Sequence, residues 1–495
     1  MKTIKEINQK IKKGEAVIVR ADEMPEIYED NPKKAASEVD IVTTGTFGAM
    51  CSSGAFLNFG HADPPIKITK LWLNDVEAYS GIAAVDAYIG ATQLRKYRDS
   101  DYGGAHVIED LVCGKEIEVR AEAYGTDCYP KKKVETTVTL EDLNQAIMYN
   151  PRNIHQRYNA ATNSSDTLMR TYMGTLLPNK RNICFAGVGE LNPLANDPGY
   201  DVIGVGTRIF LGGAKGFIVG EGTQHSPDSG AGNLSTRGDL KDMDPKYVRG
   251  CNIPGYGTSL YLGIGVPIPI LNEEIARKTA VKNEDVKTEI IDYGISRLVR
   301  PVIGEVNYEQ LFSGRVDVEG KKIRTSPLSS LKITYQLLKE LKELIEEREF
   351  YLTGKVESIP RKGQAKSMKL KKGTKTVNQV MSREVITAKA DATIKEISAL
   401  LINNHIDQIP IVDEVNKLQG IITSRDITTA LARNITKMAD VMTREVITSD
   451  LNEALDIVSR RMDKHKVDAT PVVDKNNKVV GIVTIADIMR KEGSE

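Results

Sequence analysis

The sequence predicts a mixed α/β (α+β) protein, in which a Gly-rich N-terminal domain is followed by a smaller α/β tandem repeat. Residues 380–387 recur as residues 441–448, so the last quarter of the chain holds two copies of one unit. Eighteen of the 40 glycines fall between residues 187 and 265, which indicates tightly turned backbone that is approached closely, as around a ligand. A chain of 495 residues also exceeds what one hydrophobic core normally holds, about 250 to 300 residues, so several domains are expected.

The N-terminal domain is expected to contain both helices and strands. Residues 3–20 predict a helix followed by a strand, residues 83–96 a helix, and residues 182–270 a series of turn-rich strands. An amphipathic helix is predicted at 328–350, after the capping pair Ser326-Pro327. Its apolar stripe consists of Leu331, Leu338, Leu341, Leu344 and Ile345.

A basic segment separates the two parts of the chain. Residues 361–375 carry seven basic side chains and no acidic one. A nucleic-acid-binding arm is one interpretation, but no aromatic side chain is interleaved for base stacking, which favours a solvated linker. We therefore expect a catalytic domain at 1–360, a linker at 361–375, and repeats at 376–434 and 437–492.

The two C-terminal copies match at a constant offset of 61 residues. Each predicts a strand, a helix of about 12 residues, a strand ending in Val-Asp, a Gly-led β-branched strand and a final helix. Such a unit cannot bury its sheet face alone, so the copies are expected to stack. Asp426 and Asp487 then lie near helix N-termini at the crevice, where they either accept ribose hydroxyls or merely cap their helices.

The motifs Gly-Ile-Ile-Thr-Ser-Arg-Asp and Gly-Ile-Val-Thr-Ile-Ala-Asp, at residues 420–426 and 481–487, resemble the cystathionine β-synthase (CBS) domain pair, the tandem α/β module of Bateman type. That family binds adenosyl ligands, so the resemblance implies a sensor of S-adenosyl-L-methionine or methylthioadenosine. The implied ligand-binding residues are Ile386, Thr423, Asp426, Ile447, Thr484 and Asp487.

Composition excludes several classes of protein. Lys+Arg and Asp+Glu are both 67, so no net charge draws the chain to nucleic acid or anionic membrane. No apolar run of 18 residues and no N-terminal signal core exist, and the cytoplasm is the expected location. Five unclustered cysteines predict thiols rather than a disulfide framework, and no pair has metal-ligand spacing.

Three Gly-rich segments, at 187–190, 204–208 and 211–216, resemble phosphate or carboxylate loops, but none completes a dinucleotide or P-loop fingerprint. Arg208 and Lys215 within them are candidate anchors for a substrate carboxylate, or surface charges. His61 and His225 could act as an acid or base, although a simple loop hydrogen bond is the favoured interpretation of each.

Two cysteines have the sequence context of reactive thiols. Cys51 lies in a run of small uncharged residues that can wrap a thiolate, and Cys128 is followed closely by Lys131, Lys132 and Lys133, which favour the thiolate. The apolar neighbours of Cys113 and Cys184 indicate buried structural thiols. Cys251 is ambiguous.

The contexts of Cys51 and Cys128, together with Gly-Val-Gly-Glu-Leu-Asn-Pro-Leu at 187–194 and the two CBS-like units, resemble the homocysteine-biosynthesis family of methanogenic archaea. The resemblance implies L-aspartate semialdehyde sulfurtransferase activity, in which the aldehyde carbon receives sulfur and two electrons. It carries two functional cysteines onto Cys51 and Cys128. Cys128 is then the expected persulfide, and Cys51 a second thiol of a transient disulfide.

The same resemblance implies several partners. Some relatives carry a ferredoxin-like iron-sulfur module, and this chain has no cluster-binding Cys run, so an external electron donor of ferredoxin type is expected. Sulfide or a sulfur carrier supplies the sulfur. An adenosyl ligand regulates the enzyme, no cofactor is held tightly, and a homodimer forms through the CBS pair.

Two other functions fit parts of the sequence. An inosine-monophosphate-dehydrogenase-like enzyme also joins CBS repeats to a catalytic Cys, but its Gly-Ser-Gly-Ser-x-Cys loop is missing. A non-catalytic adenosyl-ligand sensor that acts on a partner protein would tolerate alkylation of its thiols, whereas the sulfurtransferase would not.

Overall fold

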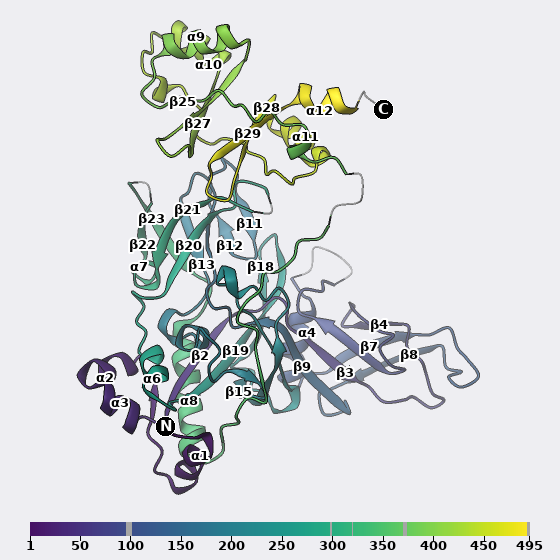
Figure 1. Cartoon of the computed structure of the whole chain (residues 1–495). Helices are drawn as coiled ribbons and strands as arrows, with labels where there is room; N and C mark the ends of the chain where they lie inside the picture. The colour runs from purple at the N-terminus through teal and green to yellow at the C-terminus, as the bar shows by residue number, and fades with distance from the viewer. Residues whose placement is uncertain (96–100, 298, 319, 370–373, 493–495) are drawn as a thin grey trace.

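A computed structural model describes residues 1–95, 101–297, 299–318, 320–369 and 374–492. Two sheets and their helices form the body of the N-terminal domain, a four-stranded sheet projects from its side, and the C-terminal repeats lie at one end (Figure 1). The mixed α/β prediction is confirmed. No helix within these ranges is long and apolar enough to span a membrane.

The chain begins with the predicted helix and strand. Helix α1 (Ile4–Lys13) starts at a capping box, in which the Thr3 hydroxyl accepts from the Glu6 N–H and the Glu6 carboxylate accepts from the Thr3 N–H. It ends at Gly14, whose φ of 75° is the left-handed C-cap conformation. Ile7 and Ile11 are fully buried, so they attach this helix to the core.

The main sheet has ten strands within the described ranges. In order across the sheet they are β1 (Ile18–Arg20), β2 (Ile41–Ala49), β19 (Gly257–Pro269), β15 (Arg208–Leu211), β16 (Ala214–Glu221), β17 (Leu234–Asp239), β9 (Gln145–Asn153), β3 (Gly54–Asn58) and β6 (Asp86–Gly90), with β18 (Val248–Ile253) paired to the first half of β19. The turn-rich strands predicted for 182–270 are therefore confirmed.

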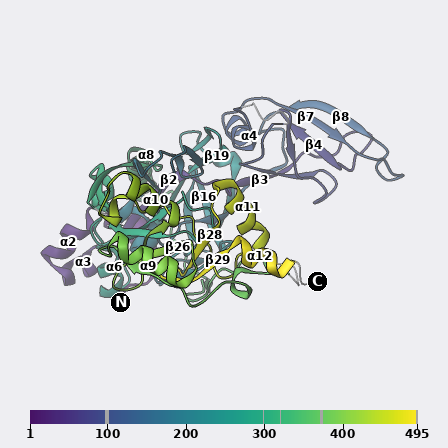
Figure 2. The same ribbon diagram turned by 90° about the horizontal axis from the view of Figure 1, so that it is seen from above.

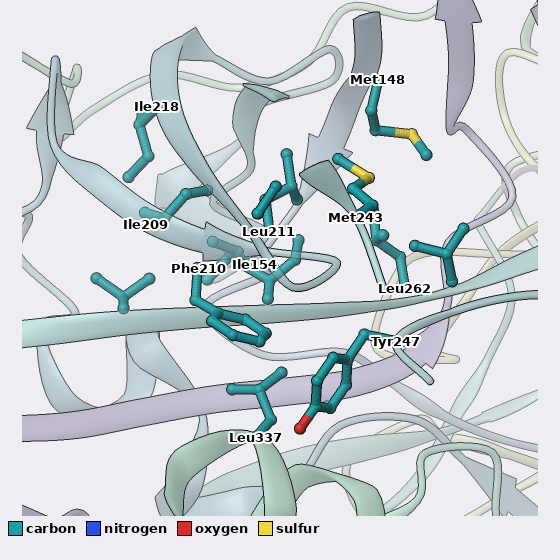
Figure 3. Close-up of a cluster of buried hydrophobic side chains, with 14 of the residues drawn as sticks. Met148, Ile154, Ile209, Phe210, Leu211, Ile218, Met243, Tyr247, Leu262 and Leu337 are labelled. Carbon is teal, nitrogen blue, oxygen red and sulfur yellow. The ribbon is translucent and has the colours of Figure 1, made fainter. Parts of the chain in front are cut away.

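Helix α8 (Leu331–Glu346) packs on β2 and β19 at three glycines. A Cβ at Gly45 or Gly265 would lie 2.7 Å from Leu337 Cδ2, and one at Gly263 would lie 2.9 Å from Leu337 Cδ1. Leu337 meets Phe210 and Tyr247 in the resulting core (Figure 3). Some of the glycine density therefore serves helix packing rather than a ligand.

Two predictions for this domain are wrong. Helix α8 begins at Leu331 with Ser330 as its N-cap, because Ser326 and Pro327 belong to strand β23 (Lys321–Pro327), which pairs with β13 (Asn182–Phe185). The helix expected at 83–96 is strand β6, where buried and half-buried side chains alternate with a period of two. Lys96 lies outside the described residues.

The second sheet lies between the main sheet and the repeats (Figure 1). Its strands, in order, are β21 (Val302–Asn307), β20 (Lys287–Asp292), β10 (Ala160–Thr162), β13, β23 and β22 (Arg315–Val318). Smaller pairs join β11 (Met169–Thr171) to β12 (Gly174–Leu176) and β14 (Gly204–Val205) to β24 (Glu357–Ser358). The remaining helices of this domain are α2 (Met24–Asp30), α3 (Pro32–Glu38), α4 (Gly104–Val112), α5 (Pro193–Asn196), α6 (Glu273–Thr279) and α7 (Tyr308–Phe312).

A separate four-stranded sheet forms an arm that extends from the side of the molecule in both views (Figures 1 and 2). Its strands, in order, are β5 (Val76–Ala78), β4 (Lys70–Leu73), β7 (Ile117–Glu122) and β8 (Lys133–Val138). All neighbouring pairs are antiparallel. The loop between β7 and β8 contains Cys128.

The two C-terminal copies have the predicted elements. The first contains β25 (Ala388–Lys389), α9 (Ile394–Asn404), β26 (Gln408–Val412), β27 (Leu418–Thr423) and α10 (Ser424–Ala432); the second contains α11 (Leu455–His465), β28 (Ala469–Val473), β29 (Val479–Thr484) and α12 (Ile485–Glu492). The leading strand is reduced to two residues in the first copy and to one bridge in the second. The bridges Ser382–Ile482 and Ile421–Thr443 relate the copies reciprocally, since both follow the 61-residue offset.

Candidate active site

A cavity of about 620 Å³ opens between the main sheet and the second sheet. Its wall combines the end of β2 and the turn that follows it, residues 152–159, the Gly187–Gly189 segment, and side chains from the second sheet. Cys51 lies in this wall and Cys128 does not. Gly187 and Gly189, with φ of 96° and 60°, let the backbone turn here, so one of the three Gly-rich segments does border a cavity.

Cys51 is held in a turn between β2 and β3. The Met50 N–H donates to the Leu260 carbonyl at 2.7 Å, and the Ser53 N–H donates back to the Met50 carbonyl at 3.0 Å. Cys51 Sγ lies 3.0 Å from Ser259 Oγ, on the neighbouring strand β19. The turn therefore presents a half-buried thiol to the cavity.

Burial raises the pKa of the Cys51 thiol above its ordinary value, because the thiolate loses hydration. Hydrogen bonds from the Ser259 hydroxyl, the Cys51 N–H and the Tyr256 hydroxyl act in the opposite direction and lower this pKa. Cys51 is consequently a protonated thiol at rest, and three hydrogen-bond donors are already placed to stabilise its thiolate form. A nucleophile formed here would be stabilised without rearrangement of the wall.

A tyrosine and arginine wall faces the same cavity. The hydroxyl groups of Tyr172 and Tyr293 share a hydrogen bond of 2.6 Å. The Arg300 guanidinium lies 4.3 Å from the ring centre of Tyr293, and its buried Nε has no hydrogen-bond partner among the described residues. Of the arginines in the wall, Arg152 is engaged at Nε with Thr223 and Arg157 lies 3.9 Å from Glu289. Arg300 therefore places a positive charge in the cavity wall without a carboxylate partner within the described ranges.

His155 is a further side chain of the wall that the sequence did not single out. Its ring meets Tyr158 edge to face, with centroids 4.6 Å apart. Burial, assisted by the positive charge of Arg152, lowers the pKa of His155 to about 4. The imidazole is therefore neutral at physiological pH and can accept or donate one hydrogen bond at each nitrogen.

Cys128 occupies a different part of the molecule. It is exposed in a tight turn in which Thr126 and Tyr129 exchange backbone hydrogen bonds of 2.9 and 3.1 Å. Tyr129 stacks on His61 with centroids 5.5 Å apart, and His61 follows the far end of β3. Since β3 begins beside Cys51 and by itself spans about 13 Å at 3.3 Å per residue, the two thiols lie apart.

The thiol that the fold does bring near Cys51 is Cys251. Cys251 on β18 pairs with Ser259 on β19, and Ser259 contacts Cys51 from its other side. Burial raises the pKa of Cys251 to about 11. Cys184 is buried as predicted, whereas the prediction of a buried Cys113 is wrong, because Cys113 caps the exposed end of α4.

Other residues named from the sequence lie away from the cavity wall. The Arg208 guanidinium donates to the Tyr351 carbonyl at 3.0 Å and lies over Phe217, and Lys215 is exposed on β16. His225 bonds the Asn233 and Pro360 carbonyls at 2.9 and 2.8 Å, which is the loop role. Within the described ranges no group of three or more His, Cys, Asp and Glu side chains is arranged to hold a metal ion.

The CBS-like residues form two matching helix caps. Asp426 Oδ2 accepts from the Thr423 N–H and hydroxyl at 2.9 and 2.7 Å, and Asp487 Oδ2 accepts from Thr484 at 3.0 and 2.8 Å. Asp426 and Asp487 therefore do cap their helices, and each uses its Oδ2 oxygen to do so. Ile386 and Ile447 are half-buried at equivalent positions.

A half-buried thiol with preformed donors lies in the wall of a cavity, and a tandem of small α/β repeats follows; this is the organisation of an enzyme domain joined to a separate repeat module. The family models agree with this division. One family, described as homocysteine biosynthesis enzyme, sulfur-incorporation, matches residues 16–352, and the CBS domain matches residues 377–433 and 438–493. The chain belongs to the homocysteine biosynthesis enzyme, sulfur-incorporation family.

Two curated relatives are similar to this chain over essentially its whole length. An L-aspartate semialdehyde sulfurtransferase from Methanosarcina acetivorans is 50% identical, over 99% of this chain and 98% of its own. One of the same name from Methanocaldococcus jannaschii is 51% identical, over 100% of this chain and 99% of its own. Among solved structures, the CBS domain pair of protein MJ0100 with 5′-methylthioadenosine and S-adenosyl-L-methionine is 44% identical, over 24% of this chain and 97% of its own, with a TM-score of 0.24.

Proposed function

We propose that this chain is an L-aspartate semialdehyde sulfurtransferase, which inserts sulfur at the aldehyde carbon and reduces the product to L-homocysteine. The observation that carries the proposal is the position of Cys51, a thiol with three hydrogen-bond donors in the wall of a cavity of about 620 Å³. Relatives of that name, 50 and 51% identical over essentially the whole chain, support the choice of substrate.

The chemistry begins with a persulfide on Cys51. Its outer sulfur attacks the aldehyde carbon, so a C–S bond forms, the C=O π bond breaks, and the oxygen takes a proton. Two electrons and a proton cleave the S–S bond and return the Cys51 thiolate. Loss of water then leaves a thioaldehyde, and two further electrons with two protons give the thiol. A low-potential external donor, such as a ferredoxin-type protein, supplies all four electrons.

The wall residues have separate roles in this scheme. The Arg300 guanidinium binds the substrate carboxylate from its place over Tyr293. The paired hydroxyl groups of Tyr172 and Tyr293 donate to the alkoxide that forms on the aldehyde oxygen. Neutral His155 accepts a hydrogen bond from the substrate ammonium group.

Cys128 is proposed as the point of sulfur entry. An exposed thiol at the tip of a hairpin can meet a sulfur carrier that the Cys51 cavity would exclude. Sulfane sulfur then passes from the Cys128 persulfide to the Cys51 thiolate, so one S–S bond breaks as another forms and no electrons are consumed. The transfer requires the two thiols to approach, by movement of the arm or between two chains.

The CBS pair is proposed to bind S-adenosyl-L-methionine or methylthioadenosine and to regulate the enzyme. Thr423, Asp426, Thr484 and Asp487 support this role, because each capped Asp keeps its second carboxylate oxygen for a ribose hydroxyl. We further propose that the chain works in the cytoplasm, where thiols stay reduced, and dimerises through this pair.

The test is anaerobic formation of homocysteine from L-aspartate semialdehyde, a sulfur source and a low-potential reductant. Cys51→Ala should abolish product with every sulfur source. Cys128→Ala should abolish it with a persulfide carrier protein and retain most of it with millimolar polysulfide, a small sulfane-sulfur donor that can load the Cys51 thiolate directly. Cys113→Ala, which removes another exposed thiol, is the matched control and should behave as the native chain.

Full activity of Cys51→Ala would refute the cavity as the site of chemistry. Equal loss from Cys113→Ala and Cys128→Ala would refute a specific entry role for Cys128. Absence of product from the native chain, with intact binding of an adenosyl ligand, would instead indicate a sensor that acts on a partner protein.

A further inference from the structure

The segment that joins β20 to β21 touches both functional parts of the molecule. Tyr293 at its start and Arg300 near its end lie in the wall of the Cys51 cavity. The residues at its ends are hydrogen-bonded: the Asp292 N–H donates to the Pro301 carbonyl at 3.0 Å, and the Tyr293 N–H donates to the Thr162 carbonyl at 2.9 Å. The middle of the segment, at Arg297, faces the second CBS repeat.

Arg297 is inserted into that repeat. Only 6% of the residue is exposed, and its Nη1 lies 3.4 Å from Thr448 Oγ1. Its Nε and Nη2 are buried and have no hydrogen-bond partner among the described residues. Burial lowers the pKa of Arg297, and the carboxylates of Asp450 and Glu453 oppose that effect. Because water does not reach this guanidinium, the protein groups packed around it, and not solvent, fix its position.

The surface that receives Arg297 is a built polar site. The Thr448 carbonyl accepts from Arg461 Nη1 at 2.9 Å, and the Arg461 guanidinium forms a two-pronged ion pair with Glu453. Arg461 is itself 9% exposed. Thr448 directly follows Ile447, a residue proposed to contact the adenosyl ligand.

The first CBS repeat lacks this site. At the 61-residue offset, Thr387 replaces Thr448, but Lys389 replaces Asp450, Ala392 replaces Glu453 and Leu400 replaces Arg461. A lysine at the equivalent of Asp450 would repel a guanidinium. The two copies therefore match at their proposed ligand positions and differ where the N-terminal domain docks.

We propose that Arg297 is a positioning residue, through which the second CBS repeat holds Tyr293 and Arg300 in the wall of the Cys51 cavity. A change in the repeat at Ile447 and Thr448 is transmitted to Arg297, and the short segment passes it to the substrate-binding guanidinium of Arg300. The structural half of this inference stands on the contacts above. The regulatory half rests on the proposed function, because it requires an adenosyl ligand in the pair and the aldehyde in the cavity.

The first test needs neither ligand nor activity. Hydrogen exchange of peptides that cover residues 290–305 is compared between the native chain and Arg297→Ala. Loss of the anchor should accelerate exchange there at least fivefold, while peptides of β2 and α8 keep their native rates. Thr448→Val, which removes the acceptor at nearly constant volume, should accelerate the same peptides less. Thr387→Val in the first repeat is the matched control and should change nothing.

The second test measures substrate binding and thiol reactivity in the Cys51 cavity. Arg297→Ala should raise the KM for L-aspartate semialdehyde at least fivefold with kcat changed less than twofold, since a displaced Arg300 weakens ground-state and transition-state binding equally. Any response of the Cys51 alkylation rate to S-adenosyl-L-methionine should fall below twofold in this variant, although calorimetry shows the ligand still bound. Arg297→Lys should restore part of the native KM.

Native exchange of residues 290–305 in both Arg297→Ala and Thr448→Val overturns the proposal, whatever the enzyme does. A native KM together with a native ligand response in Arg297→Ala also overturns it. Accelerated exchange in a chain that makes no homocysteine would leave the positioning contact established and refute the proposed reaction instead, so the two failures are distinguishable.

Discussion

Replacement of Ser259 by Ala tests whether the cavity prepares Cys51 for ionisation. The Ser259 hydroxyl lies 3.0 Å from Cys51 Sγ and lowers the thiol pKa, against the burial that raises it. A hydrogen bond to a charged group contributes about 1.5 kcal/mol, so its loss in the variant should raise the Cys51 pKa further and reduce the thiolate population about tenfold at a pH where the thiol predominates.

The direction of the expected change in alkylation rate follows from the form of the thiol that reacts. Only the thiolate is alkylated, and at pH 8 a thiol with a raised pKa is mostly protonated, so the rate is proportional to the thiolate fraction. Ser259→Ala should therefore slow alkylation of Cys51 by iodoacetamide about tenfold at pH 8. The difference should shrink as the pH rises through the native pKa and vanish above the pKa of the variant.

The assay follows the peptide containing Cys51 by mass spectrometry, and the exposed Cys128 in the same digest serves as an internal reference. Tyr256→Phe removes another donor and should slow alkylation in the same direction. Ser235→Ala removes a buried serine from another strand of the same sheet and should leave the rate unchanged. An equal or faster rate in Ser259→Ala would refute the argument that this hydroxyl stabilises the thiolate.

Three further outcomes are expected. Leu337→Ala should lower the free energy of unfolding of the N-terminal domain by about 2 to 5 kcal/mol in urea titrations, because the side chain fills the space above three glycines. Arg300→Gln should raise the KM for L-aspartate semialdehyde about 10- to 100-fold with little change in kcat, measured by initial rates, because it removes a charged hydrogen bond to the carboxylate. Asp487→Asn should weaken binding of S-adenosyl-L-methionine about tenfold in calorimetry, because a neutral amide replaces an anionic acceptor of ribose hydroxyls.

Each of these variants has a control in the chain. Lys339→Ala, on the exposed side of the same helix as Leu337, should change stability by less than about 0.5 kcal/mol. Arg237→Gln, on an exposed position of β17, should leave the KM unaltered. Asp463→Asn, which changes an exposed carboxylate of the same repeat, should leave the affinity unaltered, and a native affinity in Asp487→Asn would remove that carboxylate from ligand binding. A native KM in Arg300→Gln would remove Arg300 from substrate binding.

Local signals were sufficient for the parts of the fold in which one segment determines its own conformation. The 61-residue offset revealed both CBS repeats and their caps at Thr423 and Thr484, because a cap needs only residues three positions apart. The first helix and strand were predictable for the same reason. The helix expected at 83–96 failed because a short apolar run fits either period, and pairing with β3 selected the strand.

The sequence indicated only some of the residues of the candidate site. The contexts of Cys51 and Cys128 marked both thiols, since small residues and lysines act on their immediate neighbours. Tyr293, Arg300 and His155 carried no such mark: an ordinary tyrosine, arginine or histidine becomes part of a wall only when the strands around it are placed. His155 stands between Ile154 and Gln156, with no motif that separates it from a core histidine.

By itself, the sequence determined the two-part organisation, the paired repeats and a family resemblance that the comparisons confirm, and it marked two cysteines as candidates for the chemistry. The tertiary structure alone decided that Cys51 lies in the cavity and Cys128 on an exposed hairpin, that Cys251 approaches Cys51 through Ser259, and that Arg297 enters the second repeat. The physical reason is distance along the chain. A cap or a charged run acts within a few residues, whereas a cavity wall joins residues as distant in the sequence as Cys51 and Arg300, and only packing of the two sheets brings them together.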